Sequence, residues 1–181
     1  TIVSTYMPQS DRPSEEKGKA YELLQKLTDN KKNKGPLYVT GDFNARLIYP
    51  TTETDREIIG KHTMHNNDDA LTRKEFGESM RENRDLLIEY CHTNEMKVMN
   101  TMFRKPIHKL ATYRKRKEIE GVDYEDIQIE THEQLDYTLA TRRWKNNFKN
   151  METDTKANIN TDHYPIIATL RGRLTKTTPK G

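Results

Sequence analysis

The sequence predicts an α/β fold in which helices flank a mixed β-sheet. The first observation is a strand, helix, strand order at the start of the chain: residues 1–7 and 37–39 are rich in apolar and β-branched side chains, and apolar residues at helical spacing lie between them. The second is a series of short, hairpin-like strands after residue 97. The third is a second stretch of helical spacing over residues 76–94.

The first helix begins at the start signal Pro13-Ser14-Glu15-Glu16, and Gly35-Pro36 breaks the chain before the second strand. If the first two strands are parallel, their carboxyl ends meet at one edge of the sheet. Residues 45–74 have poor hydrophobic spacing and are predicted to form a long surface loop. Further strands are predicted at residues 97–103, 111–114, 126–130, 135–140, 148–151 and 165–171, and the last is predicted to be buried.

Length and composition indicate one domain over residues 1–172, followed by a polar tail or linker over residues 173–181. Only 32% of the residues are hydrophobic and 33% are charged, so the core must be lean. A net charge of +3, from 31 basic and 28 acidic residues, is too balanced to indicate nucleic-acid binding by itself. The single cysteine, Cys91, excludes an internal disulfide. No apolar run reaches transmembrane length, so no membrane partner is expected.

Polar residues stand at the ends of several predicted strands. They are Tyr6 in STYMP, Asp42 and Asn44 in VTGDFNA, Asp136 in EQLDYTLA, and Asp162 and His163 in NTDHYPI. Carboxylates brought together repel one another unless a cation or a protonated imidazole lies among them. Such a cluster suits a hard divalent ion, Mg²⁺ or Mn²⁺, and a histidine beside it suits phosphoester hydrolysis.

Each of these motifs taken singly also has a purely structural interpretation. Gly-Asp followed by Asn is a good turn or helix cap, and Asp136 is a plausible charge at a strand edge. Tyr6 alone reads as a core aromatic with a polar tip. Only the combination of the motifs, in their order along the chain, is specific.

That order resembles the endonuclease/exonuclease/phosphatase family from the first strand to about Leu170. The family includes deoxyribonuclease I, apurinic endonucleases, inositol polyphosphate phosphatases and the endonucleases of LINE-type (non-LTR) retrotransposons. The segments IIGKHTMHNND, RENRDLLIEYCHTNEMKVMNTMF and ATYRK look like the retrotransposon branch and its host-gene relatives, the craniofacial-development-protein-2-like proteins. The resemblance implies the four-layer α/β/β/α sandwich of the deoxyribonuclease I type.

The resemblance also implies roles for the matched residues. Asp42 would orient or deprotonate the attacking water, and Asn44 would position water and phosphate. His163 would contact the scissile phosphate as an acid, a base or a transition-state stabiliser, with Asp136 fixing its orientation. Tyr6 would donate a hydrogen bond to the phosphate.

For the metal, the resemblance implies Asp162 and Asp42 as ligands of Mg²⁺ or Mn²⁺. The principal metal ligand of the family is a glutamate in a Gln-Glu pair near the start of the domain, and no acidic residue of this chain stands in that motif. We therefore expect the fold to lack its N-terminal strands and the site to lack one carboxylate.

Further contacts with substrate are expected at Asn83, Thr112 and Tyr113. Two departures from the family pattern lie near these positions. Arg84 stands where a glycine commonly follows the asparagine, and Thr161 replaces the usual serine before the Asp-His pair. The second change preserves the hydroxyl.

The function implied is that of a metal-dependent, DNA-nicking endonuclease domain of a retrotransposon-like protein, which leaves a 3′ hydroxyl for a reverse transcriptase where the parent polyprotein carries one. DNA is then the partner, and the location is intracellular, nuclear or cytoplasmic. The alternatives are an apurinic endonuclease or a small-molecule phosphatase of the same family, or a truncated copy without catalytic activity.

Three other features have a structural interpretation that we favour. His62-x-x-His65 is half a zinc motif in a polar loop without a nearby cysteine. The basic run from Arg114 to Lys117 is interpreted as a hairpin tip near DNA phosphates rather than a localisation signal. Arg142-Arg143-Trp144 is interpreted as a connection between strands rather than a stacking surface for nucleic acid.

Overall fold

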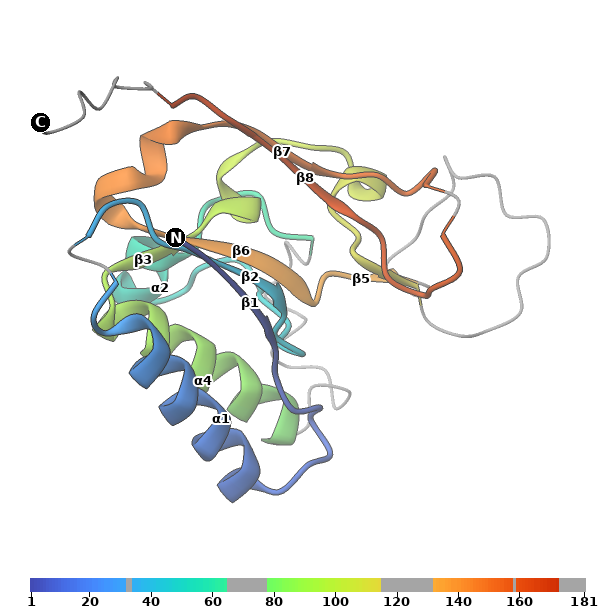
Figure 1. The fold of residues 1–181 in the computed structure, drawn as a ribbon. Coiled ribbons are helices and arrows are strands. Elements are labelled where there is room, and N and C mark those ends of the chain that lie inside the picture. Colours follow the sequence, from blue (N-terminus) through green and yellow to red (C-terminus); the bar gives the residue numbers. More distant parts are fainter. Residues whose placement is uncertain (32–33, 65–77, 115–131, 158, 173–181) are drawn as a thin grey trace, which may run out of the picture.

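The structure, a computed structural model, describes residues 1–31, 34–64, 78–114, 132–157 and 159–172. Its helices and strands are, in chain order, β1 (Ile2–Tyr6), α1 (Ser14–Thr28), β2 (Tyr38–Asp42), α2 (Glu53–Ile58), α4 (Glu78–Thr93), β3 (Met96–Val98), β4 (Tyr113–Arg114), β5 (His132–Glu133), β6 (Asp136–Thr141), β7 (Phe148–Thr153) and β8 (Ile166–Leu170). Short 3₁₀ turns occupy Met99–Met102, Ile107–Lys109 and Arg142–Asn147. The helices, a four-stranded sheet and a two-stranded sheet lie in successive layers (Figure 1), which confirms a mixed sheet flanked by helices.

The four-stranded sheet has the order β1-β2-β6-β3 and positions the polar strand ends. β1 pairs with β2 in parallel, and β2 pairs with β6 antiparallel. The predicted strand, helix, strand order is therefore confirmed, and the parallel pairing meets the condition under which both strand ends lie at one edge. The register places Tyr6 of β1 opposite Asp42 of β2, and Asp42 opposite Asp136 of β6. Three of the predicted polar residues thus form one row across three strands.

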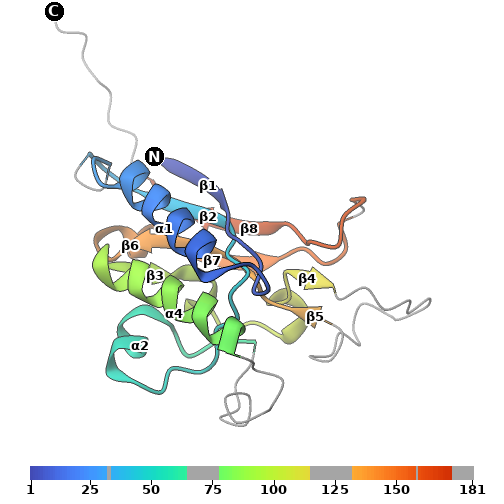
Figure 2. The ribbon, with the colours of Figure 1, turned by 90° about the horizontal axis from the view of Figure 1, so that it is seen from below.

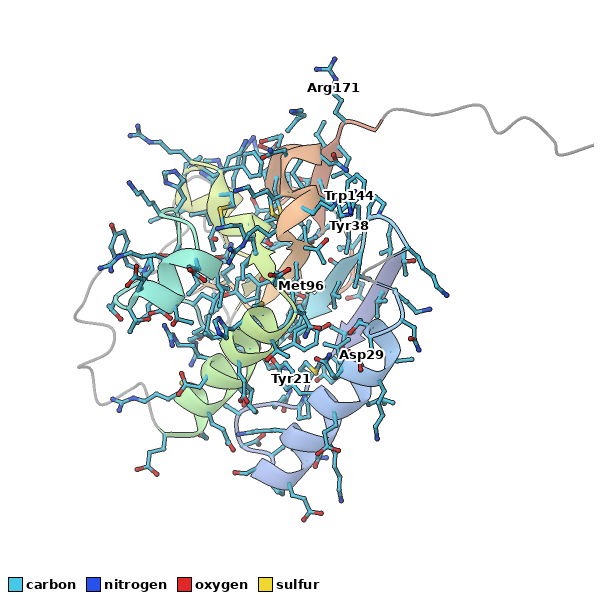
Figure 3. All side chains as sticks on the ribbon, turned by 90° about the vertical axis from the view of Figure 1, so that its left-hand side faces the viewer. Tyr21, Asp29, Tyr38, Met96, Trp144 and Arg171 are labelled. Carbon is cyan, nitrogen blue, oxygen red and sulfur yellow. The ribbon has the colours of Figure 1, made fainter. Side chains whose placement is uncertain are left out.

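Helices α1 and α4 lie side by side on one face of this sheet (Figure 2) and cover the main core. Tyr21 of α1 lies between the two helices (Figure 3), with its ring centroid 6.0 Å from that of Tyr90. A charged residue also joins them. Lys17 is only 1% exposed, and its Nζ donates to the Ser10 carbonyl at 2.8 Å and to Glu82 Oε2 at 2.7 Å. In the part of the chain that the structure describes, no helix is long and apolar enough to cross a bilayer.

The two-stranded sheet of β7 and β8 covers the other face through a second core cluster around Met99, Phe148 and Met151. The prediction that the last strand is buried is wrong: only Ile166 is partly buried, while Ile167 and Leu170 are 46% and 45% exposed. Within the described residues, β8 pairs with β7 alone, so its second edge and much of its surface meet solvent. An apolar sequence predicts a strand, but neighbours decide its burial.

The prediction of a surface loop over residues 45–74 is also wrong for its described part. Leu47, Ile48, Ile58 and Ile59 are buried, and the short helix α2 ends at Ile58. A capping box stabilises the start of α2: the Thr52 side chain accepts from the Asp55 N–H at 3.0 Å, and the Asp55 side chain accepts from the Thr52 N–H. Six helical residues are too few to produce a readable apolar period.

Two predicted strands are shorter than expected, and three other predictions fall on residues that the structure does not describe. β3 ends at Val98 because the chain continues as a 3₁₀ turn, in which the Thr101 hydroxyl donates to the Val98 carbonyl at 2.7 Å. The strand predicted at 111–114 is reduced to Tyr113–Arg114. The strand predicted at 126–130, the helix start at 76–77 and the tail at 173–181 lie outside the described residues.

Replacing Gly41 by alanine should strongly destabilise the fold. Gly41 has a φ of +144°, and an added Cβ would lie 1.9 Å from the Thr5 carbonyl oxygen of the paired strand. We expect Gly41→Ala to lower the free energy of unfolding by at least about 3 kcal/mol. Gly35→Ala is the matched control, because Gly35 also has a positive φ, +125°, but no atom lies within 4 Å of its added Cβ. Equal losses in urea unfolding for both variants would contradict the close strand approach.

Candidate active site

The ends of β1, β2 and β6 bring the predicted polar residues together at one edge of the sheet. Tyr6, Asp42 and Asp136 are neighbours in register, and the Met7 N–H donates to the Asp42 carbonyl at 2.8 Å, extending the pairing beyond Tyr6. The Tyr6 side chain is 67% exposed, and Asp42 is only 8% exposed. The row therefore presents an accessible phenol beside a buried carboxylate.

His163 joins this row from the segment before β8. Its Nδ1 lies 2.9 Å from Asp136 Oδ2, and its Nε2 lies 3.9 Å from Asp42 Oδ2. Backbone pairing with β4 holds the segment in place: Arg114 N–H donates to the Asp162 carbonyl at 2.8 Å, and a bridge pairs Tyr113 with His163. An imidazole thus lies between two carboxylates that are 94 residues apart in the sequence, at positions 42 and 136.

Asp42 is the most perturbed acid of the cluster. Burial raises its pKa from 3.8 to about 6, the charge of Asp136 adds to the rise, and the Asn44 N–H, which donates to Asp42 Oδ1 at 2.8 Å, partly offsets it. A carboxyl group with this pKa changes charge close to neutral pH. Perturbed acids of this kind are concentrated at functional sites.

Asn44 is held in an unusual backbone conformation. Its φ is +48°, a left-handed value that asparagine tolerates better than most residues. Its Nδ2 donates to the Met7 carbonyl at 2.8 Å, so the residue ties the loop after β2 to the end of β1. The sequence Gly-Asp-Phe-Asn therefore forms a turn, as its purely structural interpretation predicted, and it also places Asp42 and Asn44 in the site.

The three predicted substrate contacts differ in exposure. Asn83 and Thr112 are 3% and 0% exposed, and both bond to backbone groups. Thr112 Oγ1 accepts from the N–H groups of Leu135 and Asp136 at 2.9 and 3.0 Å. Tyr113 is half-buried, with its ring 5.0 Å from that of His163. Contact with substrate stays a prediction for all three, while the geometry of Asn83 and Thr112 is that of positioning residues.

The sequence analysis did not predict the partners of three further polar side chains, Arg46, Asn100 and Arg84. Arg46 makes a bidentate ion pair with Glu133, at 2.6 and 2.5 Å, and Glu133 is 2% exposed. Asn100 accepts from the Thr138 N–H at 2.8 Å and donates to the Asp136 carbonyl at 3.4 Å. Arg84, the departure from the family glycine, pairs with Asp55 at 2.8 Å. No local pattern reveals these pairs, because the partners are far apart in sequence.

A divalent metal fits the chemistry of the donors but is not shown by their arrangement. The carboxylate oxygens of Asp42, Asp136 and Asp162 are hard ligands of the kind Mg²⁺ prefers. Across the residues that the structure describes, no group of three or more His, Cys, Asp or Glu side chains is arranged to hold a metal ion. Asp42 and Asp162 as metal ligands therefore stay predictions.

One of the three other sequence features has a structural role. Arg142 pairs with Glu57 at 3.2 Å, and the Arg143 guanidinium carbon lies 5.4 Å from the centroid of the Trp144 ring, in the turn between β6 and β7. The predicted connection between strands is thus observed. His65, like Lys115, Arg116 and Lys117, lies outside the described residues, so the zinc motif and the basic run stay unassessed.

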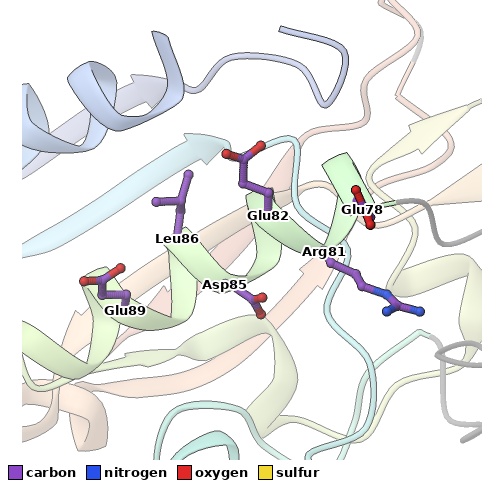
Figure 4. A pocket seen from close by; sticks show the side chains of 6 residues that line it. All are labelled: Glu78, Arg81, Glu82, Asp85, Leu86 and Glu89. Carbon is purple, nitrogen blue, oxygen red and sulfur yellow. The ribbon is translucent and has the colours of Figure 1, made fainter. Parts of the chain in front are cut away.

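A pocket of about 380 Å³ opens along α4 (Figure 4). Its lining comes from Glu78, Arg81, Glu82, Asp85, Leu86 and Glu89. Four carboxylates against one guanidinium would repel a phosphate group. The cluster around His163 is therefore the better candidate for phosphate chemistry.

Comparison with solved structures defines the class of fold. The chain aligns with a variant of the 3′ phosphatase NExo from Neisseria bound to product DNA hairpin (TM-score 0.59, 12% identity, 94% of this chain and 61% of that one). It also aligns with the endonuclease domain of TRAS1, a telomere-specific non-LTR retrotransposon (0.52, 13%, 94% and 57%), and with an AP endonuclease from Archaeoglobus fulgidus (0.59, 17%, 93% and 60%). The chain therefore has the deoxyribonuclease I-like fold of the endonuclease/exonuclease/phosphatase proteins, as predicted.

Sequence comparison identifies particular relatives within this class. The chain is 27% identical over 180 residues to craniofacial development protein 2 of Bos taurus, and 25% identical over 180 residues to that of Tragulus javanicus. Each alignment covers 99% of this chain and 26% of the relative, so the chain spans about a quarter of the length of these curated proteins. No protein-family profile matches it.

Replacing Asp42 by asparagine should stabilise the metal-free protein at neutral pH. The raised pKa means that the unfolded carboxyl ionises first, so wild-type stability falls as the pH rises from about 4 to about 6. Asp42→Asn removes this loss, and we expect a gain of about 1–2 kcal/mol at pH 7.5, after allowing for solvent screening. The gain should vanish near pH 4.

Urea unfolding in the presence of a chelator measures this effect. Asp11→Asn, at an exposed loop position, is the control and should change stability little at either pH. A loss of stability for Asp42→Asn at pH 7.5 would show that the buried carboxylate is better compensated than its surroundings indicate.

Proposed function

We propose that the chain carries the catalytic cluster of a metal-dependent phosphodiesterase that nicks DNA, of the retrotransposon-endonuclease type. The observation that carries the proposal is the placement of His163 between Asp136 and Asp42, at the edge where Tyr6 and Asn44 also lie. This arrangement can position a phosphate, receive a proton from water and supply one to a leaving oxygen. The fold class and the order of the sequence motifs both support it.

Asp136 determines which nitrogen of His163 faces the substrate. An ionised carboxylate only accepts hydrogen bonds, so the 2.9 Å contact requires the proton to be on Nδ1. Nε2 is then free to contact the scissile phosphate, because its 3.9 Å distance from Asp42 exceeds a hydrogen bond. When protonated, Nε2 can donate to the phosphate or to the departing 3′ oxygen.

Asp42 is placed to act on the attacking water. With a pKa of about 6, its carboxylate can accept a proton from water as the water oxygen attacks phosphorus. The bond from phosphorus to the 3′ oxygen then breaks, and the products are a 5′ phosphate and a 3′ hydroxyl. Asn44 and Tyr6 are the nearby neutral groups that would hold the water and the phosphate oxygens. A divalent ion bound by Asp42 and Asp162 would neutralise developing charge on the phosphate.

The proposed partner is DNA, and a reverse transcriptase would use the 3′ hydroxyl where the parent polyprotein contains one. The structural neighbours include a 3′ phosphatase bound to a product DNA hairpin and the endonuclease domain of a non-LTR retrotransposon. Since these likenesses are below 25% identity, they support the fold, and the substrate stays part of the proposal. An intracellular location, nuclear or cytoplasmic, follows from a DNA substrate.

The histidine contacts can be tested by nicking of supercoiled plasmid DNA. We expect the chain to nick undamaged DNA with Mg²⁺, and His163→Ala and Asp136→Asn to lower the rate by about 100-fold or more. His92→Ala, at an exposed position in the last turn of α4, is the matched control and should retain full activity. Preference for abasic DNA or for inositol phosphates would favour the other enzymes of the class. Absence of hydrolysis on all three substrates would favour a non-catalytic copy.

Metal dependence is tested separately on the same assay. Chelation should abolish nicking, and added Mg²⁺ or Mn²⁺ should restore it. Asp162→Asn should raise the metal concentration needed for half-maximal rate by about tenfold. Asp154→Asn, a carboxylate in the loop before the Asp-His pair that accepts from the Lys156 N–H, is the control. Nicking in a chelator, or an unchanged metal requirement for Asp162→Asn, would refute the ligand assignment.

A further inference from the structure

Asn83 connects helix α4 to two loops of the candidate site. It lies in the second turn of α4 and is 3% exposed. Its Nδ2 donates to the Pro8 carbonyl at 3.0 Å and to the Asn44 carbonyl at 2.9 Å. Pro8 follows the end of β1, and Asn44 follows the end of β2, so one amide group spans both strand ends.

The orientation of this amide is determined by its neighbours. Both neighbours are carbonyl oxygens, which only accept, so the NH₂ group must face them and the oxygen must point away. The oxygen, Oδ1, is buried and has no hydrogen-bond partner within the described residues. An unsatisfied buried oxygen lowers the stability of the fold, and the two bonds donated by Nδ2 are made despite this cost. An aspartate at this position has the same shape but no N–H group, so it cannot donate these bonds.

One acceptor residue, Asn44, and Met7, which precedes the other acceptor Pro8, belong to a set of contacts around Asp42. Asn44 Nδ2 donates to the Met7 carbonyl, and the N–H groups of Met7 and Asn44 both donate to Asp42. Asn83 adds the external support, because α4 is packed on the core and is tied to α1 by the neighbouring Glu82 through Lys17. Without Asn83, the loops after β1 and β2 keep contacts with each other but lose the side chain of α4 that bonds to both of them.

We propose that Asn83 is a positioning residue that holds the backbone of Asn44, in its left-handed conformation, and the loop after Tyr6 at a fixed distance from Asp42. It acts through the backbone of these two loops, and this role requires no contact with substrate. The effect on catalysis rests on the proposed function, while the effect on the two loops does not. Misplacing reacting groups by about 1 Å is sufficient to lower a rate by about 100-fold.

The test compares Asn83→Ala with Asn94→Ala. Asn94 is also a buried asparagine, at the other end of α4, and its Nδ2 also donates twice, to Gln25 Oε1 at 2.7 Å and to the Tyr90 carbonyl at 2.9 Å. Both variants therefore lose a buried amide with two donated bonds. If Asn83→Ala does not fold, Asn83→Ser, which keeps one donor, takes its place.

Two measurements are made on each variant at a temperature well below its unfolding midpoint. Hydrogen exchange should be at least about tenfold faster at the Met7 and Asn44 amides in Asn83→Ala, and unchanged there in Asn94→Ala. The nicking kcat should fall by about 30–100-fold with KM within about threefold in Asn83→Ala, and stay at the wild-type value in Asn94→Ala.

The outcomes separate the two proposals. Unchanged exchange at Met7 and Asn44 in Asn83→Ala overturns the positioning role, whatever the activity. Faster exchange with an unchanged kcat overturns its catalytic consequence. If the wild-type chain hydrolyses no phosphoester, the proposed function fails, and the exchange comparison with Asn94→Ala still decides whether Asn83 holds the loops.

Discussion

The close approach of β1 and β2 at Gly41 is the constraint on which the candidate site depends. A side chain at Gly41 would collide with the Thr5 carbonyl, so only glycine allows the parallel register that continues to Tyr6 and Asp42. The same register carries across β2 to Asp136. Because a slip of one residue turns each side chain to the opposite face of a sheet, the row of polar strand ends exists in this pairing alone.

Neutral, buried side chains hold the acidic cluster. Asn83, Thr112 and Asn100 each satisfy backbone groups of the segments that carry Asn44 and Asp136. Neutral groups fix the backbone of these segments without cancelling the negative charge of the Asp42 and Asp136 carboxylates. A cation or a protonated imidazole needs that negative charge in order to bind there. The guanidinium of Arg46, two residues after Asn44, pairs with Glu133.

Burial of the Asp42 carboxyl group lowers the stability of the fold and raises the pKa of that group. The folded state keeps a carboxyl group in a place that disfavours its charged form, and this destabilises the folded state at neutral pH. The same environment gives the group a pKa suited to proton transfer near neutrality. The strand that follows His163, β8, is also poorly covered. It has one partner strand in the described part of the chain, and much of its surface is exposed.

The sequence by itself determined the α/β class, the strand, helix, strand order of the first unit and the residues at the strand ends, because strand periodicity and polar motifs are local signals. It also identified Asp42, Asn44, Asp136 and His163 as one cluster through the order of their motifs. Only the tertiary structure decided which side chains face inward. The burial of Asn83, the helix α2 inside a predicted loop and the exposure of β8 depend on partners distant in sequence, and burial is a property of the neighbours rather than of the residue.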